Sequence, residues 1–240
     1  MSFPKIKILV IAALFILTVL SCMATAQESY TISPSQFVFL ARMGGGQVSA
    51  GGQFQYDQVP DGYEDETPYT SSNGYATNWG AEFWWFPASG RSFLLTASVL
   101  DQTGYNSLKP DDDKDYGAKA VDKKNMQYNM SNILVGLGYR FLYGERNDFG
   151  TNLHLKLGGG GANIVISDLM DARGGNAAVE IGANIFKRFD NDFLIGLQWD
   201  IRMWGMWVTE TEMKYLNTDA DFAYGGGGVF LSVIGGWELI

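Results

Sequence analysis

The chain is poor in the residues that cross-link proteins or hold metals. Its 240 residues contain one cysteine, Cys22, and one histidine, His154. A single cysteine cannot form an internal disulfide, and zinc sites need several cysteine or histidine ligands. The acids from Asp111 to Asp122 fit a calcium loop badly, because the glycine comes one position late. The sequence therefore predicts no metal site and no cofactor.

Long apolar runs are absent after the N-terminus. Residues 8–20 are apolar except for Thr18, follow two lysines and precede Ala24-Thr25-Ala26. This pattern predicts a signal peptide over residues 1–26 and a single β domain over residues 27–240. A competing interpretation uses Val19-Leu20-Ser21-Cys22 as a lipoprotein site with Cys22 acylated. No later run reaches the roughly 18 apolar residues of a membrane helix.

Basic residues are scarce relative to acidic ones. The chain has 17 lysines and arginines against 26 aspartates and glutamates, and Lys5 and Lys7 lie in the signal segment. Phosphate contacts require a basic surface, so the sequence predicts no nucleic-acid partner.

The sequence is rich in glycine, with 30 residues, and in aromatic residues, with 14%. It also shows repeated two-residue alternation, most clearly between Phe193 and Met203. One face there is apolar, whereas the other carries Gly196, Asp200 and Arg202. A period of two indicates a β-strand. An apolar face opposite a small or polar face is typical of a transmembrane β-barrel, with lipid outside and polar groups inside.

The alternation and the turn residues divide the chain into eight strands. Three connections, 88–91, 144–148 and 190–192, are tight and contain Gly, Asn or Asp. Four others are long and polar, at about 58–73, 103–126, 167–175 and 209–221. The sequence predicts an antiparallel up-and-down transmembrane β-barrel, with long loops at one rim and tight turns at the other. Its expected strands are 36–57, 74–87, 91–102, 127–143, 149–166, 176–189, 192–208 and 223–240.

The first strand changes its pattern at three glycines. Phe37 to Met43 place apolar residues at odd positions, whereas Val48 and Ala50 are apolar at even positions. A glycine bulge at Gly44-Gly45-Gly46 would switch the parity. A hairpin turn at the same glycines is the alternative and would give nine strands.

The inward face of the predicted strands collects charges of both signs. Because an eight-stranded barrel is narrow, we expect these charges to pair and to plug the interior. Neighbouring strands predict that Glu180 meets Arg202 and that Arg140 lies near His154. A narrow polar path is the alternative. The expected lumen network is Arg42, Glu82, Arg140, His154, Lys156, Glu180, Asp200 and Arg202, with Glu238 as a further inward acid.

Most tryptophans fall near predicted strand ends, where an amphipathic ring fits the boundary between membrane and water. We expect them to form aromatic girdles, not a ligand cage. The predicted interface residues are Trp79, Trp85, Trp199, Trp207 and Trp237, and Trp204 is assigned to the same girdles.

Residues 136–141, Gly-Leu-Gly-Tyr-Arg-Phe, together with the plan of loops and turns, resemble the small eight-stranded outer-membrane barrels of the OmpA, OmpX and OmpW kind. The resemblance implies an outer-membrane location, contact with membrane lipid and lipopolysaccharide, and insertion by the barrel assembly machinery. Such barrels usually end on an aromatic residue, whereas this chain ends Trp237-Glu238-Leu239-Ile240. A lipid A deacylase of similar architecture carries His-x-Ser, whereas this chain has His154-Leu155-Lys156. We therefore expect no enzymatic activity.

The first long loop carries five acids without a basic neighbour, interleaved with Tyr63, Tyr69 and Tyr75. Such a loop suits an extracellular protein partner or weak cation binding between lipopolysaccharide phosphates. The sequence thus favours an outer-membrane barrel with a structural or surface-interaction role. Two alternatives stay open: a narrow porin or channel for small hydrophobic molecules, and a soluble exported barrel that binds a hydrophobic ligand as lipocalins do.

Overall fold

The computed structural model describes residues 35–56, 66–87, 92–110, 124–143, 148–166, 170–213 and 218–239. The predicted signal peptide lies outside these residues, as do segments 57–65 and 111–123 of the two longest connections. No helix in the described ranges is long and apolar enough to cross a membrane.

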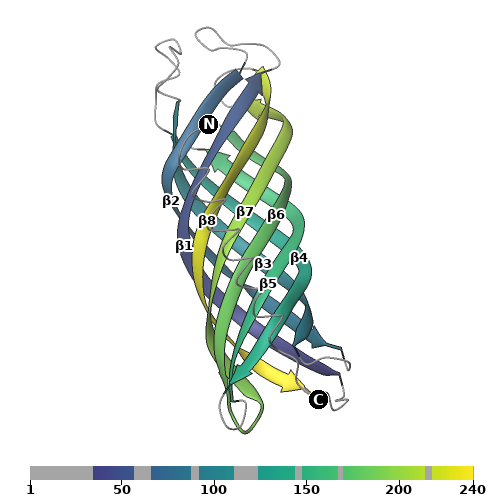
Figure 1. Ribbon diagram of the computed structural model, residues 1–240. Coiled ribbons are helices and arrows are strands. Elements are labelled where there is room, and N and C mark those ends of the chain that lie inside the picture. Colours follow the sequence, from purple (N-terminus) through teal and green to yellow (C-terminus); the bar gives the residue numbers. More distant parts are fainter. Residues whose placement is uncertain are drawn as a thin grey trace, which may run out of the picture. The chain divides into compact units, whose positions relative to one another are not determined.

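Eight strands form a closed barrel in which each strand pairs antiparallel with the next (Figure 1). Strand β8 returns to pair with β1, from Phe37 opposite Leu239 to Tyr56 opposite Ala220. The predicted antiparallel eight-stranded barrel is confirmed. The strands are β1 Gln36–Tyr56, β2 Glu66–Phe86, β3 Phe93–Pro110, β4 Lys124–Tyr143, β5 Phe149–Ile166, β6 Met170–Arg188, β7 Phe193–Met213 and β8 Thr218–Leu239.

The strands run further at the long-loop rim than the sequence predicts. Strand β2 begins at Glu66, β6 at Met170 and β8 at Thr218, all inside segments that we expected to be loops. Strand β4 has 20 residues, whereas a tilted strand crosses the bilayer in about 9–11. The strands therefore continue beyond the hydrocarbon region as an extended barrel wall.

Strand β1 is continuous through Gly44-Gly45-Gly46, which form neither a bulge nor a turn. Arg42 and Val48 both point inward and are buried, so the parity does not change. The shift in register with β2 comes later, between Val48 and Ala50. Our expectation was wrong because it took every apolar side chain to face outward, and Val48 packs inside the barrel.

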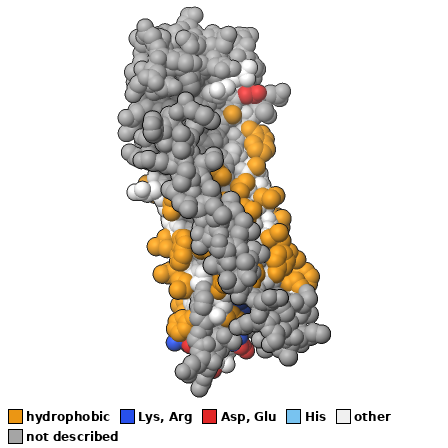
Figure 2. Space-filling model, in the orientation of Figure 1, with side chains coloured by type: hydrophobic (Ala, Val, Ile, Leu, Met, Phe, Trp, Pro, Cys, Tyr) orange, Lys and Arg blue, Asp and Glu red, His pale blue; other side chains and the backbone are white. Residues whose placement is uncertain are grey.

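The outward side chains near the tight-turn rim form an apolar band, which we call the belt. Figure 2 shows hydrophobic side chains over much of the wall that is in view. Such an apolar surface would be unfavourable in water. In a bilayer it contacts lipid chains, and these contacts are equivalent to those that the lipid chains make with one another. Well-exposed belt residues are Ile133, Val135 and Leu137 on β4, Leu155 and Leu157 on β5, and Val229, Leu231 and Val233 on β8.

Above the belt the polarity of the wall reverses, in a zone that we call the collar. It comprises residues 47–53, 74–77, 101–107, 125–131, 159–166, 170–177, 205–208 and 221–227. Strand β4 shows the change most clearly. In its belt part Leu137 points outward and Arg140 inward, whereas in its collar part Gln127 points outward and Tyr128 is fully buried. The collar therefore has the inside-out pattern of a water-soluble barrel.

An arginine introduced in the belt should lower the free energy of unfolding far more than an arginine introduced in the collar. Leu137→Arg should lower the free energy of unfolding in lipid vesicles by about 2–4 kcal/mol, because the charge would lie in the middle of the belt. Gln127→Arg on the same strand should cost at most about 1 kcal/mol. Urea titration followed by tryptophan fluorescence measures both values. Equal costs would contradict the proposed boundary between belt and collar.

Candidate functional site

The lumen at belt level holds seven ionisable side chains that point toward one another, the central charge network. They come from five strands, β1, β2, β5, β6 and β7, because the inward parity of each strand places one or two of them at the same level. Each is at most 5% exposed. The network consists of Arg42, Glu82, His154, Lys156, Glu180, Asp200 and Arg202.

Glu180 is the hub of this network. Its carboxylate accepts hydrogen bonds from Nη1 of Arg42 at 3.1 Å and from Nζ of Lys156 at 3.1 Å. Nε of Arg202 donates at 3.1 Å, and Nη2 of Arg202 makes a second, shorter contact with the same carboxylate. The strand register pairs Glu180 directly with Arg202 and with Lys156. Only the contact with Arg42 crosses the lumen.

The other two carboxylates complete the charge balance. Asp200 pairs with Nη2 of Arg42 and lies 3.0 Å from Nε2 of His154. Glu82 lies 2.7 Å from Nζ of Lys156. Three carboxylates thus face three permanent cations, so each buried charge has an opposite charge beside it, which limits the desolvation penalty.

His154, Glu180 and Asp200 also have the spacing of a metal site, with donor atoms within 4.8 Å of one another. Both carboxylates already bind cationic side chains, and Arg42 contacts each of them. A divalent ion would add two positive charges beside Arg42, Lys156 and Arg202 and would displace these ion pairs. The donor set therefore fits an ion-pair network better than a metal centre.

Arg140 belongs to a second group near the tight-turn rim, the rim cluster, and not to the central network. Its Nη1 donates to Glu238 at 3.2 Å, and Arg188 contacts the other oxygen of Glu238 at the same distance. The guanidinium also lies 3.5 Å from the ring centre of Phe86. The structure does not join Arg140 to His154 as predicted, because the register pairs His154 with Gly138 and Arg140 with Asn152.

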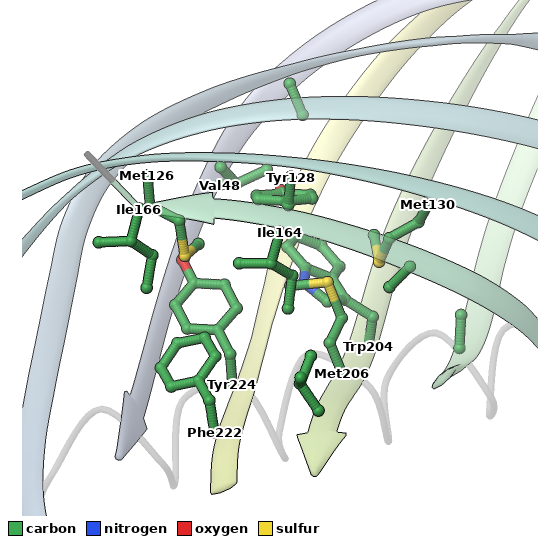
Figure 3. Packing of buried hydrophobic residues seen from close by; sticks show 14 of the residues in the cluster. Val48, Met126, Tyr128, Met130, Ile164, Ile166, Trp204, Met206, Phe222 and Tyr224 are labelled. Atoms are coloured by element: carbon green, nitrogen blue, oxygen red, sulfur yellow. The ribbon is translucent and has the colours of Figure 1, made fainter. Parts of the chain in front are cut away.

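The collar interior is filled by an apolar plug that the sequence analysis missed (Figure 3). Tyr128, Trp204 and Tyr224 are nearly fully buried, and the Tyr128 ring lies 6.1 Å from each of the other two. Alternation alone could not reveal the plug, because it does not tell inside from outside. The signal that could have revealed the plug is the row of polar residues at the alternate positions of the same segments. The plug comprises Val48, Met126, Tyr128, Met130, Ile164, Ile166, Trp204, Met206, Val208, Phe222 and Tyr224.

Gln102 joins the plug to the central charge network. Its carbonyl oxygen accepts a 2.6 Å hydrogen bond from Nη1 of Arg202, and its amide nitrogen lies 3.2 Å from the hydroxyl oxygen of Tyr128. Arg202 also lies 4.7 Å from the ring centre of Phe230. The polar and apolar layers of the lumen are therefore in direct contact.

The predicted interface tryptophans all point outward, but at different levels. Trp85 and Trp237 lie near the tight-turn rim, and Trp79 and Trp207 lie where the belt meets the collar. Trp199 lies in the middle of the belt part of β7 instead of at a strand end. Its register partners are Ala183 and Leu231, so its ring faces the hydrocarbon region. Trp204, assigned to the same girdles, points inward into the plug.

Comparison with known proteins supports the fold. No protein-family model matches the chain, and no curated protein sequence matches it. The outer membrane protein OprG of Pseudomonas aeruginosa superposes with a TM-score of 0.51 at 11% identity, over 86% of this chain and 96% of OprG. Neisserial surface protein A gives 0.37 at 10% identity, over 81% of this chain and 96% of its own. The protease OmpT of Escherichia coli gives 0.35 at 9%, over 90% and 100%.

Of these three likenesses, the one to OprG has a TM-score high enough to support the fold. Together with the apolar belt and the closed sheet of eight strands, it shows that the chain has the fold of an outer-membrane β-barrel. At belt level the apolar side chains point outward and the charged ones point inward. This arrangement is the reverse of a lipocalin, whose apolar side chains point inward.

Removing the hub of the charge network should destabilise the barrel strongly. Glu180→Gln keeps the shape of the side chain but leaves Arg42, Lys156 and Arg202 with one carboxylate fewer. We expect the free energy of unfolding to fall by about 3–5 kcal/mol, the usual cost of removing one partner of a buried ion pair. Guanidinium titration of the refolded protein measures this. The exposed Asp171→Asn on the same strand is the matched control, and equal stability of both variants would refute the role of Glu180.

Proposed function

We propose that this protein is a closed outer-membrane barrel with a structural or surface-interaction role, and that nothing permeates its lumen. The observation that carries the proposal is the filling of the lumen at successive levels. The plug occupies the collar, and the central charge network occupies the belt. The rim cluster with Arg140 lies toward the tight turns.

The filling follows from the strand number. Eight strands enclose a space that side chains just fill, without room for a water column. Glu180 links residues of β1, β5 and β7, and Arg42 on β1 reaches over β8 to Asp200 on β7. Opening a path would break several buried ion pairs at once, which is costly without water to replace them. This argues against the narrow porin and against the small-hydrophobe channel.

The chemistry of His154 supports a role without catalysis. Its Nε2 lies 3.0 Å from Asp200 and 3.4 Å from Glu180, and the ring is 5% exposed. A catalytic histidine must reach a substrate, whereas this one is enclosed by carboxylates that cations also hold. We therefore assign His154 to the network that stabilises the barrel.

Interaction is assigned to the outside of the protein, where the collar stands above the belt. Its wall is polar, and the stacked rings of Tyr75 and Tyr105 lie 5.1 Å apart and are 59% and 38% exposed. Exposed aromatic rings among polar groups are typical of protein interfaces. We propose that membrane lipid and lipopolysaccharide contact the belt, and that an extracellular protein partner binds the collar and its connections. Insertion by the barrel assembly machinery is part of the same proposal.

Planar bilayer recording tests the closed lumen. The purified protein should add no ion conductance above the leak of the bilayer, whereas a general porin inserted under the same conditions should conduct. Insertion is verified by the heat-dependent shift in electrophoretic mobility that folded barrels show. Stable unitary conductance steps from the folded protein would refute the closed lumen. An ion-selective current in particular would favour the channel alternative.

A further inference from the structure

A groove of about 600 Å³ crosses β7, β8 and β1 where the belt meets the collar. Gly51, Gly205 and Gly225 form its floor, and Gln53 and Trp207 border it. The register places Gly225 between Gly205 on one side and Gly51 on the other. By strand alternation these five residues face outward, so the groove opens on the wall, and the inward residues Met206 and Tyr224 line it from behind the glycines.

Two glycines of the floor, Gly205 and Gly225, are not required by the packing of the described strands. A Cβ atom built at Gly205 meets nothing within 4 Å, and one at Gly225 meets only the carbonyl oxygen of Trp204, at 3.6 Å. Inside the barrel the situation differs, since a Cβ at Gly136 would lie 2.7 Å from Cα of Lys156. Within the described part of the chain, the space next to Gly205 and Gly225 is therefore open to another molecule.

Trp207 forms a firm edge of this groove. Its ring lies across the wall over Gly175 of β6, where a Cβ atom would come within 2.7 Å of Cζ2 of the ring. The tryptophan is nevertheless 48% exposed. A rigid aromatic edge of this kind supplies contact area at little cost in conformational entropy.

The groove continues the lipid-facing surface. Met203 on β7 and Val229 on β8 lie just below it in the belt and are 53% and 62% exposed. Gln53 at its upper border belongs to the polar collar. A molecule in the groove would therefore meet hydrocarbon at one end and the polar boundary of the bilayer at the other.

We propose that this groove binds an acyl chain of an outer-leaflet glycolipid, with the head group beside Gln53 and Trp207. An acyl chain gains no hydrophobic free energy by leaving its lipid neighbours, so affinity must come from close van der Waals contact, which glycine surfaces allow. The groove volume is within the range of small-molecule sites, about 300–1,000 Å³. A second barrel would present the broad convex wall of a whole sheet, whereas an acyl chain is narrow enough to lie along the glycine floor. A lipid therefore fits the groove better. This inference rests on the lipopolysaccharide contact proposed above and is independent of whether the lumen conducts.

Native mass spectrometry of the detergent-purified protein with added lipid A tests this proposal. The wild-type protein should retain one lipid A molecule, and Gly205→Leu, which fills the groove, should weaken that binding at least tenfold. Gly161→Leu is the matched control. Gly161 faces outward on β5, and a Cβ there also meets nothing within 4 Å, but it does not line the groove.

Trp207→Ala removes the edge without filling the floor and should also weaken binding. If Gly205→Leu does not fold, the binding of lipid A to Trp207→Ala tests the proposal instead. Equal lipid retention by the wild-type, Gly205→Leu and Trp207→Ala proteins would overturn the proposal, as would equal loss in Gly161→Leu. A wild-type dimer that Gly205→Leu converts to a monomer, without a change in lipid retention, would overturn it in favour of a second copy as the occupant.

Discussion

The closure of β8 onto β1 is the constraint on which the rest of this structure depends. In the hydrocarbon region no water is available to backbone N–H and C=O groups, so an open sheet edge would leave a row of them unpaired. Every residue of β1 from Phe37 to Tyr56 has a partner on β8, which removes that edge. Gly44 shows how closely the two strands approach, because a Cβ there would lie 2.6 Å from Cα of Ser232.

Closing only eight strands leaves an interior that must be filled by side chains. In the middle of the belt the outward side chains are apolar, and the inward positions hold charges that pair with one another. Toward the tight turns a second apolar cluster, which includes Leu40, Trp84 and Phe186, also packs inside. At collar level the outward positions are polar, so the apolar side chains turn inward and pack as Tyr128, Trp204 and Tyr224 do. One continuous strand, β4, changes from the first pattern to the second without a break in its pairing.

The same reversal explains which parts of the structure could be predicted from the sequence. Strand number and the set of inward charges follow from alternation and turn residues, which are local. Contacts between sequence neighbours, such as Glu180 with Arg202, follow from one tight turn. Contacts between strands that are not paired, such as that of Arg42 on β1 with Asp200 on β7, depend on closure and on the stagger of the strands. The collar was missed because an apolar side chain marks the outside only where the surroundings are lipid, as Val48 and Trp204 show.

The two layers of the lumen have different physical consequences for the barrel. The ion pairs of Arg42 and Glu180 are directional and tie particular strands together across the interior, so a change in register or stagger would break them and leave buried charges unpaired. The plug is non-directional and stabilises the collar as a hydrophobic core stabilises a soluble protein. Because Gln102 contacts both Arg202 and Tyr128, a displacement of the plug would also disturb the contacts of the charge network. A partner bound to the outer wall of the collar faces a sheet supported from within, so binding there requires no opening of the lumen.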